Sequence, residues 1–254
     1  MLQVHRHDRI LELRLSRPPA NALDEALIAA LLEAVRTATA DDARAIVLSG
    51  QPGLFSAGLD VPALLRLERP AMRRVWEDFL ALMAALARSP IPVASAITGH
   101  SPAGGAVIAL FCDYRVMARS ASAEKPYRIG LNEVAVGLVV PEVIARALAR
   151  LVGPHRAERL LVEGRMLSAE EALAIGLVDE LAEGEAVVET ALAWCRRHLA
   201  LPPQAMSGTR RIARADLASI FDQPGMDTED FLDVWFSEET QGTLRALAER
   251  LGKR

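Results

Sequence analysis

Short segments that suit β-strands alternate with longer segments of helical periodicity along the first half of the sequence. Four strand-like segments, the first alternating and the others almost wholly apolar, occupy residues 10–15, 45–48, 93–97 and 114–117. Apolar residues at helical spacing predict helices at 24–40 and 64–88 between them. Uncharged strands are typical of parallel sheets that helices cover on both faces. This alternation therefore predicts an α/β fold.

The sequence after Pro141 changes character, because helical periodicity continues without strand-like segments. We expect helices at residues 144–152, 157–163, 168–175, 185–199, 203–220 and 228–250. The start of the third is marked by a capping box, Ser168 followed by Glu171. The pattern predicts an α/β core over residues 1–195 and a helical C-terminal region over residues 196–254, with a hinge at 222–225.

The composition argues against several classes of function. A formal net charge of −4 without a long basic run, and an aromatic content of 4%, argue against a nucleic-acid partner. No segment approaches the roughly 20 apolar residues that span a bilayer, and the N-terminus lacks the apolar run of a signal peptide. Cys112 and Cys195 form no disulfide pattern. We therefore expect a cytoplasmic protein that does not associate with membranes.

Several other polar and aromatic residues receive structural interpretations. His5 and His7 alternate on a predicted strand, but no third metal ligand is near them in sequence, so we expect a solvated strand and no metal site. Asp113 and Arg115 are predicted to pair with each other or to cap strand ends. His100 could line a pocket or serve a loop. The three tryptophans are expected to pack on helical faces: Trp76, Trp194 and Trp235.

Two turns rich in small residues each follow a strand-like segment and precede a predicted helix. They cover residues 54–60 and 101–105, and the second contains Gly104 and Gly105. The first N–H groups of a helix lack acceptors within the helix, and glycine lets a ligand approach the backbone closely. The Gly104 amide and an amide of the first turn could therefore donate to one oxygen as an oxyanion hole. The alternative is that these glycines serve only tight turns and close packing.

Glu133 is an isolated carboxylate in a third turn, residues 129–134, that is otherwise poor in charge. A carboxylate in apolar surroundings has a raised pKa, which suits proton transfer near neutral pH. The alternative is an exposed turn residue or a partner in helix capping. Glu142 could be another acid, although its place at a predicted helix start favours an ordinary interaction with the helix dipole.

A series of short motifs occurs in the order found in the crotonase (enoyl-CoA hydratase/isomerase) family, which the sequence resembles over about residues 5–250. They are FSAGLD at 55–60, PAGG at 102–105, CDYR at 112–115, GLNE at 130–133, AEEA at 169–172 and GLVD at 176–179. Several motifs matched in order are more specific than any single pair of glycines. PAGG, CDYR and IGLNE look most like the Δ3,Δ2-enoyl-CoA isomerases of this family.

The resemblance implies a fold, a substrate and an assembly. The fold would be a spiral of ββα turns followed by a helical trimerisation region, in agreement with the alternation described above. The substrate would be an acyl-CoA thioester, with no prosthetic group and no metal. The chain would form a homotrimer, or a hexamer made of two trimers.

The resemblance also implies where the thioester and the CoA would bind. The backbone amides of Leu59 and Gly104 would hold the thioester oxygen. Ala57 and Gly58 belong to the segment that would bind CoA, with the Ala57 backbone near the adenine. Asp60 ends this motif, and we expect it at a helix start.

The residues that would contact the CoA phosphates depart from the family pattern. Many relatives carry a lysine soon after the Ala-Gly-x-Asp motif, and Val61-Pro62 stands there instead. Arg250 falls near the place of a basic residue that does similar work in other members, so the resemblance implies a phosphate contact for it. A solvated helix face is the alternative interpretation of Arg250.

The available acids distinguish the reactions of the family. The hydratases use two glutamates; by position, Val107 stands here in place of the first, and Glu133 matches the second. Adding water requires one group to activate the water and another to deliver a proton, whereas one carboxylate can move a proton between two carbons. The resemblance therefore implies that Glu133 takes a C2 proton from a 3-enoyl-CoA and returns it at C4. A hydratase with a second acid from elsewhere, or a non-catalytic relative that binds CoA esters or a protein partner, are the alternatives.

Overall fold

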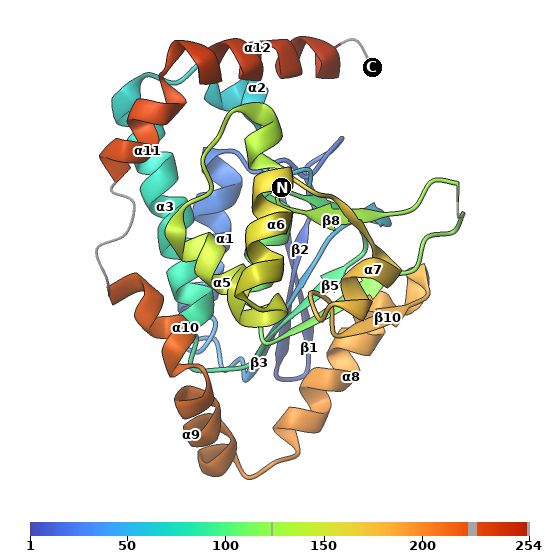
Figure 1. Ribbon diagram of the computed structural model, residues 1–254. Helices are drawn as coiled ribbons and strands as arrows, with labels where there is room; N and C mark the ends of the chain where they lie inside the picture. Colours follow the sequence, from blue (N-terminus) through green and yellow to red (C-terminus); the bar gives the residue numbers. More distant parts are fainter. Residues whose placement is uncertain (123, 223–227, 253–254) are drawn as a thin grey trace.

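A central β-sheet organises the computed structural model, which describes residues 1–122, 124–222 and 228–252. Its strands lie in the order β1 (Leu2–His7), β2 (Ile10–Leu15), β3 (Ala45–Ser49), β5 (Val93–Ile97), β7 (Tyr114–Ala118) and β10 (Glu180–Ala182) (Figure 1). β1 and β2 pair antiparallel, and each later neighbouring pair is parallel. The predicted strands and their parallel arrangement are thus confirmed.

A smaller sheet continues from the ends of the central strands. β4 (Gly53–Leu54), β6 (Gly99–Pro102) and β8 (Arg128–Gly130) lie parallel, and β9 (Leu167–Ser168) is antiparallel to β8. β4 follows β3 and β6 follows β5 after a few residues, so each segment gives one strand to each sheet before a helix begins. Because β4 pairs with β6, the turns that follow these two strands lie next to each other.

Different helices cover the two faces of the central sheet. Ile46, Leu48 and Val93 pack in the larger core with α1 (Glu25–Thr37), α3 (Arg69–Arg88) and α4 (Gly104–Leu110). On the opposite face, Val47 and Ala96 pack with α8 (Val187–Leu199). Burial of both faces explains why these strands carry almost no charge.

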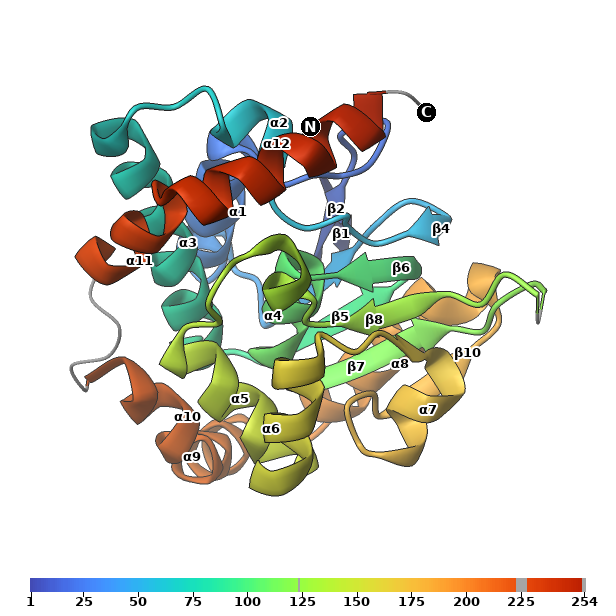
Figure 2. The same ribbon diagram turned by 45° about the horizontal axis from the view of Figure 1, so that its top comes forward.

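The remaining helices surround this core (Figures 1 and 2). They are α2 (Val61–Leu64), α5 (Glu142–Val152), α6 (Pro154–Glu163), α7 (Ala169–Ala174), α9 (Pro203–Ala213), α10 (Ala215–Ser219), α11 (Thr228–Trp235) and α12 (Glu238–Gly252), with 3-10 helices η1 (Glu133–Val136), η2 (Gly184–Ala186) and η3 (Ile220–Asp222). Both hydrogen bonds of the predicted capping box at Ser168 are present. The division predicted at residue 195 falls inside α8, and residues 223–225 of the predicted hinge lie outside the described residues.

Three predicted helices are wrong in length, because each is divided in two. Residues 64–88 divide between α2 and α3, since Pro70 lies in the first turn of α3 and disfavours helix before it. Residues 203–220 divide at Arg214, whose backbone leaves the helical conformation. Residues 228–250 divide at Ser237, whose side chain accepts a hydrogen bond from Thr240 N as a new N-cap.

Asp113 holds the α9 and α10 region against the core. Its carboxylate accepts a hydrogen bond from Arg210 Nε at 2.8 Å and pairs with Arg214 Nη1 at 3.0 Å. All three side chains are nearly buried, since they are 10%, 12% and 9% exposed respectively. One carboxylate therefore neutralises two guanidinium groups that the fold has removed from water.

The predicted pairing of Asp113 with Arg115 is wrong. Arg115 pairs instead with Asp179, just before β10, at 2.7 Å. Asp113 also accepts a hydrogen bond from the amide of Val93 at the start of β5. The alternative prediction, that these residues cap strand ends, is therefore confirmed for Asp113.

Replacing Asp113 with Ala is expected to destabilise the fold by about 3–5 kcal/mol, because two buried guanidinium groups would lose their shared carboxylate. Thermal unfolding followed by circular dichroism should show a Tm lower by roughly 10 °C. Asp222→Ala is the matched control, because it removes an exposed partner of the exposed Arg88 and should change Tm little. Equal values of Tm for Asp113→Ala and the wild type would contradict this account.

Candidate active site

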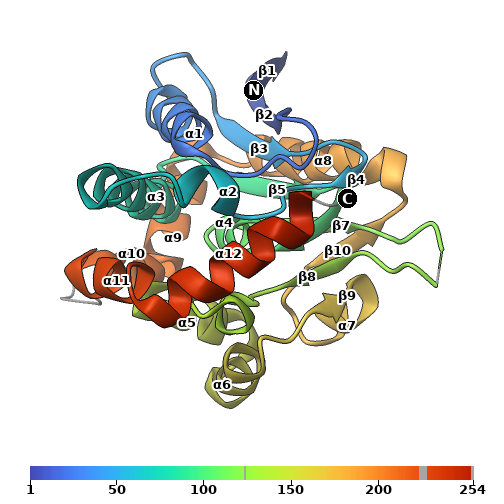
Figure 3. The same ribbon diagram turned by 90° about the horizontal axis from the view of Figure 1, so that it is seen from above.

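A cavity of about 560 Å³ lies where the turns after β4 and β6 meet η1 and the C-terminal helices. Its walls come from the segment after β2, these two turns, and α3, α4, η1, α5, α11 and α12. Figures 2 and 3 show α12 lying across this end of the molecule, and α12 contacts both α2 and η1. The cavity thus lies between the α/β core and the C-terminal helices.

Leu59 and Gly104, whose amides are predicted to hold a thioester oxygen, both line this cavity. Their backbone segments are in contact: a methyl group added to Gly104 would lie 3.4 Å from Leu59 N, and one added to Gly58 would lie 3.1 Å from Gly104 N. Within the described residues, neither the Leu59 nor the Gly104 amide donates to an acceptor of the protein. The structure therefore brings two unsatisfied donors together at one wall of the cavity.

The backbone around these amides has a conformation that the sequence explains. Gly58 has φ of +86°, which glycine adopts readily. The Leu23 amide donates to Gly58 O, and the Leu23 carbonyl accepts from Asp60 N. In such parallel pairing the N–H group of the residue between them, Leu59, faces away from Leu23. Ala103, directly before Gly104, has φ of +46°, a strained value of the kind that clusters at functional sites.

Glu133 begins η1 and lines the same cavity. Its Oε2 atom is buried and has no hydrogen-bond partner among the described residues. Burial raises the pKa of Glu133 to about 7, while its own backbone opposes the rise to a smaller extent. A carboxyl group with this pKa can both accept and release a proton near neutral pH.

The other predicted binding residues are placed as follows. Ala57 is exposed at the edge of the cavity, and Gly58 shapes the turn behind it without lining it. Asp60 starts α2 as expected, since its carboxylate accepts a hydrogen bond from Ala63 N at 3.0 Å. It also pairs with Arg17, another lining residue, at 2.7 Å, and Arg17 pairs with Asp24 as well.

Val107, at the position of the first hydratase glutamate, and Arg250, the predicted phosphate contact, both lie on helices. Val107 on α4 lines the cavity and is 1% exposed, so the position of the first hydratase glutamate is apolar here. Arg250 lies exposed on α12 and does not line the cavity, although Leu247 and Leu251 of the same helix do. The CoA phosphate contact of Arg250 stays a prediction.

The residues weighed as alternatives lie outside the cavity. His100 Nδ1 accepts a hydrogen bond from Arg128 N at 3.2 Å, next to the β6–β8 pair. Glu142 lies exposed in the first turn of α5 and pairs with Arg146, as expected for a helix start. His7 Nε2 lies 2.9 Å from the carboxylate of Glu12. Across residues 1–122, 124–222 and 228–252, no group of three or more His, Cys, Asp or Glu side chains could hold a metal.

Sequence reasoning missed several lining residues. Trp76 was expected to pack, and it does, but it also lines the cavity together with Phe231 of α11. Arg17, in the segment after β2, also lines the cavity. Asn132 belongs to the GLNE motif, and its buried Oδ1 lacks a partner among the described residues. The motif was a usable signal for Asn132, whereas nothing local marks Trp76 or Phe231 as neighbours.

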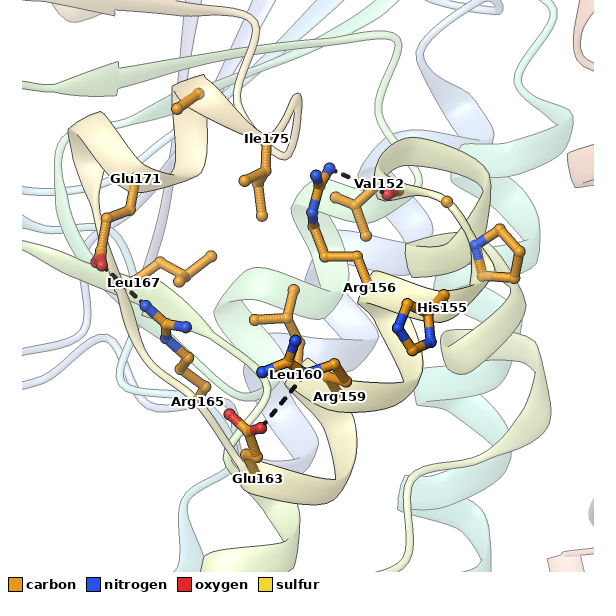
Figure 4. A pocket seen from close by; sticks show the side chains of 13 residues that line it. Val152, His155, Arg156, Arg159, Leu160, Glu163, Arg165, Leu167, Glu171 and Ile175 are labelled. Atoms are coloured by element: carbon orange, nitrogen blue, oxygen red, sulfur yellow. Dashed lines mark hydrogen bonds and ion pairs between the residues drawn. The ribbon is translucent and has the colours of Figure 1, made fainter.

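A second cavity, of about 610 Å³, lies between α6 and α7 (Figure 4). Four of its charged side chains form pairs: Arg159 lies 3.7 Å from Glu163, and Arg165 lies 3.0 Å from Glu171. Arg156 donates a hydrogen bond to the backbone oxygen of Val152. None of the residues predicted for catalysis or CoA binding lines it. The candidate active site is therefore the cavity that contains Glu133.

Comparisons with known proteins agree with this fold. The sequence matches the family described as Enoyl-CoA hydratase/isomerase over residues 5–251. Human mitochondrial enoyl-CoA delta isomerase 1 is 32% identical over 242 residues, which cover 94% of this chain and 79% of the human protein. The probable enoyl-CoA hydratase EchA17 of Mycobacterium tuberculosis is 34% identical over 214 residues, which cover 83% of this chain and 77% of that protein.

The structural comparison gives the same result. The crystal structure of human mitochondrial delta3-delta2-enoyl-CoA isomerase has a TM-score of 0.91 and 30% identity, and the match covers 99% of this chain and 98% of that one. This chain belongs to the enoyl-CoA hydratase/isomerase family, and its α/β architecture is the crotonase fold. The resemblance stated from the motifs is confirmed. The isomerase and hydratase relatives have nearly equal sequence identity to this chain, so identity does not distinguish the two reactions. The choice between them depends on the residues of the site.

The described part of the chain contains no helix that is both long and apolar enough to cross a membrane.

Proposed function

We propose that the protein is an enoyl-CoA isomerase that moves a C=C bond from position 3 to position 2 of an enoyl-CoA. The supporting observation is the single available carboxylate of the cavity, Glu133. The other acid among the described lining residues is Asp60, which is engaged with Arg17 and with the start of α2. Val107 supplies no second acid on α4. One free carboxylate suits a reaction that moves one proton.

The proposed reaction begins with the thioester oxygen at the amides of Leu59 and Gly104. The Glu133 carboxylate takes a proton from C2, and the electron pair of that C–H bond moves toward the thioester to give a dienolate. The two amides stabilise the negative charge on the oxygen more than they stabilise the neutral carbonyl, so they lower the barrier. C4 then takes the proton from Glu133, the carbonyl re-forms, and the double bond lies between C2 and C3. The carboxylate is restored and no other reactant is consumed.

The experiment that tests this function uses purified protein and a 3-enoyl-CoA. We expect formation of the conjugated 2-enoyl-CoA, which is detected by its ultraviolet absorbance. An absence of conversion at every acyl length would contradict the proposal. Hydration of a 2-enoyl-CoA to a 3-hydroxyacyl-CoA, detected by chromatography, would instead favour the hydratase reaction, which the identity to EchA17 supports.

The pH dependence of the proposed isomerisation follows from the raised pKa of Glu133. The free enzyme needs this group ionised, because the carboxylate is the base that takes the C2 proton. With a pKa of about 7, kcat/KM should fall about tenfold for each pH unit below 7 and level off above it. A profile from pH 5 to pH 9 measures this. Constant kcat/KM down to pH 5 would contradict the assignment.

The substrate, cofactor, assembly and location of the protein are proposed or predicted as follows. The substrate is an acyl-CoA, and the proposed steps require no prosthetic group. The trimer or hexamer, the cytoplasmic location and the division of the chain at residue 195 stay predictions from the sequence.

A further inference from the structure

The cavity has one exposed side and one buried side. On the exposed side it is bordered by residues that reach solvent, among them Val139, 52% exposed, and Leu251, 50% exposed. On the buried side it is lined by three aromatic side chains that are at most 4% exposed: Trp76, Phe79 and Phe231. A hydrocarbon chain that enters from the exposed side would therefore meet an aromatic wall.

The wall is a stack between two helices that are distant in sequence. The rings of Trp76 on α3 and Phe231 on α11 have centroids 3.5 Å apart and planes 4° apart. Phe79 lies beside Trp76, with ring centroids 5.9 Å apart. Behind Phe231 lies the fully buried Trp235, also with a centroid separation of 5.9 Å. Phe231 is therefore packed between two tryptophan rings, and interiors packed in this way resist displacement of a side chain.

Ion pairs hold α11 against α3 alongside this stack. Arg69 donates to Glu229 at 2.8 Å and also pairs with Asp233, and Arg73 pairs with Glu229. A single exposed ion pair contributes little, but these pairs form a network across the same two helices. The network and the stack together fix the position of Phe231 relative to the cavity.

We propose that the Trp76–Phe231 stack ends the acyl-binding part of the cavity and sets the longest acyl chain that the protein accepts. This inference rests on the proposed function. The same lining includes Val107 and Ile144, which are apolar and buried, so the cavity suits an unsubstituted aliphatic tail. A longer tail could bind only by separating the two packed rings. Each methylene beyond the limiting length should therefore lower the affinity for that acyl-CoA by about tenfold or more.

The test measures the affinity of saturated acyl-CoAs of increasing length by isothermal titration calorimetry, which requires no turnover. In the wild type, affinity should rise with each added methylene up to a limiting length and then fall. In Phe231→Ala the limit should move to longer chains by at least two carbons, with the affinity for the first excluded length rising about tenfold. Phe231→Leu is a milder truncation that should move the limit in the same direction if the Ala variant does not fold.

Phe236→Ala is the matched control, because it removes a ring from the turn between α11 and α12 without altering the described lining of the cavity. Its limiting length should equal that of the wild type. A limit that stays fixed in folded Phe231 variants, or that moves equally in Phe236→Ala, would overturn the proposal. A limit that moves as expected in a protein without isomerase activity would contradict the proposed function alone. Failure to bind any acyl-CoA would overturn both.

Discussion

Glu133→Gln is expected to lower kcat for isomerisation by roughly 10²–10⁴-fold while the protein stays folded. The amide has nearly the size of the carboxylate, but it cannot take the C2 proton and return it at C4. Glu133 Oε2 has no partner among the described residues, and the hydrogen bond from the residue's own backbone can still be accepted by the amide oxygen of glutamine, so the substitution should leave the fold intact. The rate of formation of 2-enoyl-CoA from 3-enoyl-CoA measures the effect.

Glu142→Gln is the matched control for this variant. Glu142 also stands at a helix start, but its side chain is 57% exposed and pairs with Arg146 outside the cavity. We expect wild-type activity from this control. A loss of equal size in both variants, or full activity in Glu133→Gln, would remove Glu133 from the mechanism. Hydration that survives in Glu133→Gln would show that another acid serves that reaction.

Glu133→Gln should also change how the stability of the fold depends on pH. The pKa of Glu133 is raised from its ordinary 4.5 to about 7, so the unfolded chain releases this proton at lower pH than the folded protein does. The wild type therefore loses stability as pH rises from 4.5 to 7, and the loss remains at higher pH. Glutamine does not titrate, so at pH 8 the variant should be more stable by about 3 kcal/mol. Urea unfolding at pH 5 and pH 8 measures this difference.

The parts of this fold that were predictable are those that local sequence specifies. The uncharged segments of β3 and β5 predict burial on both faces of a sheet, and Ser168 with Glu171 predicts the start of α7. The glycines at 58 and 104 mark the turns whose backbones approach each other. The roles proposed for Leu59 and Glu133, by contrast, were predicted from ordered motifs, because spacing alone left a packing turn and an exposed glutamate as alternatives.

The parts that were not predictable depend on contacts between distant segments. The break at Ser237 is an exception, because it is marked locally: residues 237–243 carry no apolar side chain, and the Ser237 side chain caps α12. Asp113 was paired with its near neighbour Arg115, whereas its partners Arg210 and Arg214 lie about a hundred residues further along. Trp76 was predicted to pack, and only the return of α11 makes that packing a wall of the site.

Gly104→Ala is expected to lower kcat for isomerisation by about 10²-fold with little loss of stability. The added methyl group would lie 3.3 Å from Gly58 Cα and 3.4 Å from Leu59 N, so it would press apart the two segments that carry the amides. The alanine keeps its backbone N–H, but a displaced amide donates poorly to the oxygen, and complete loss of one donor of an oxyanion hole costs about 10²–10³ in rate. The loss should fall on kcat more than on KM, because the hole acts on charge that develops in the transition state.

The fold should tolerate this substitution for two reasons. Gly104 does not have a left-handed backbone conformation, and alanine suits the first turn of α4. The nearest atom, Leu23 Cδ1 at 3.0 Å, is the end of a flexible side chain that can move aside. Gly208→Ala is the control, because nothing lies within 4 Å of the added methyl group there, and it should keep full activity. Wild-type kcat in a folded Gly104→Ala protein would mean that the reacting oxygen does not lie between these two amides.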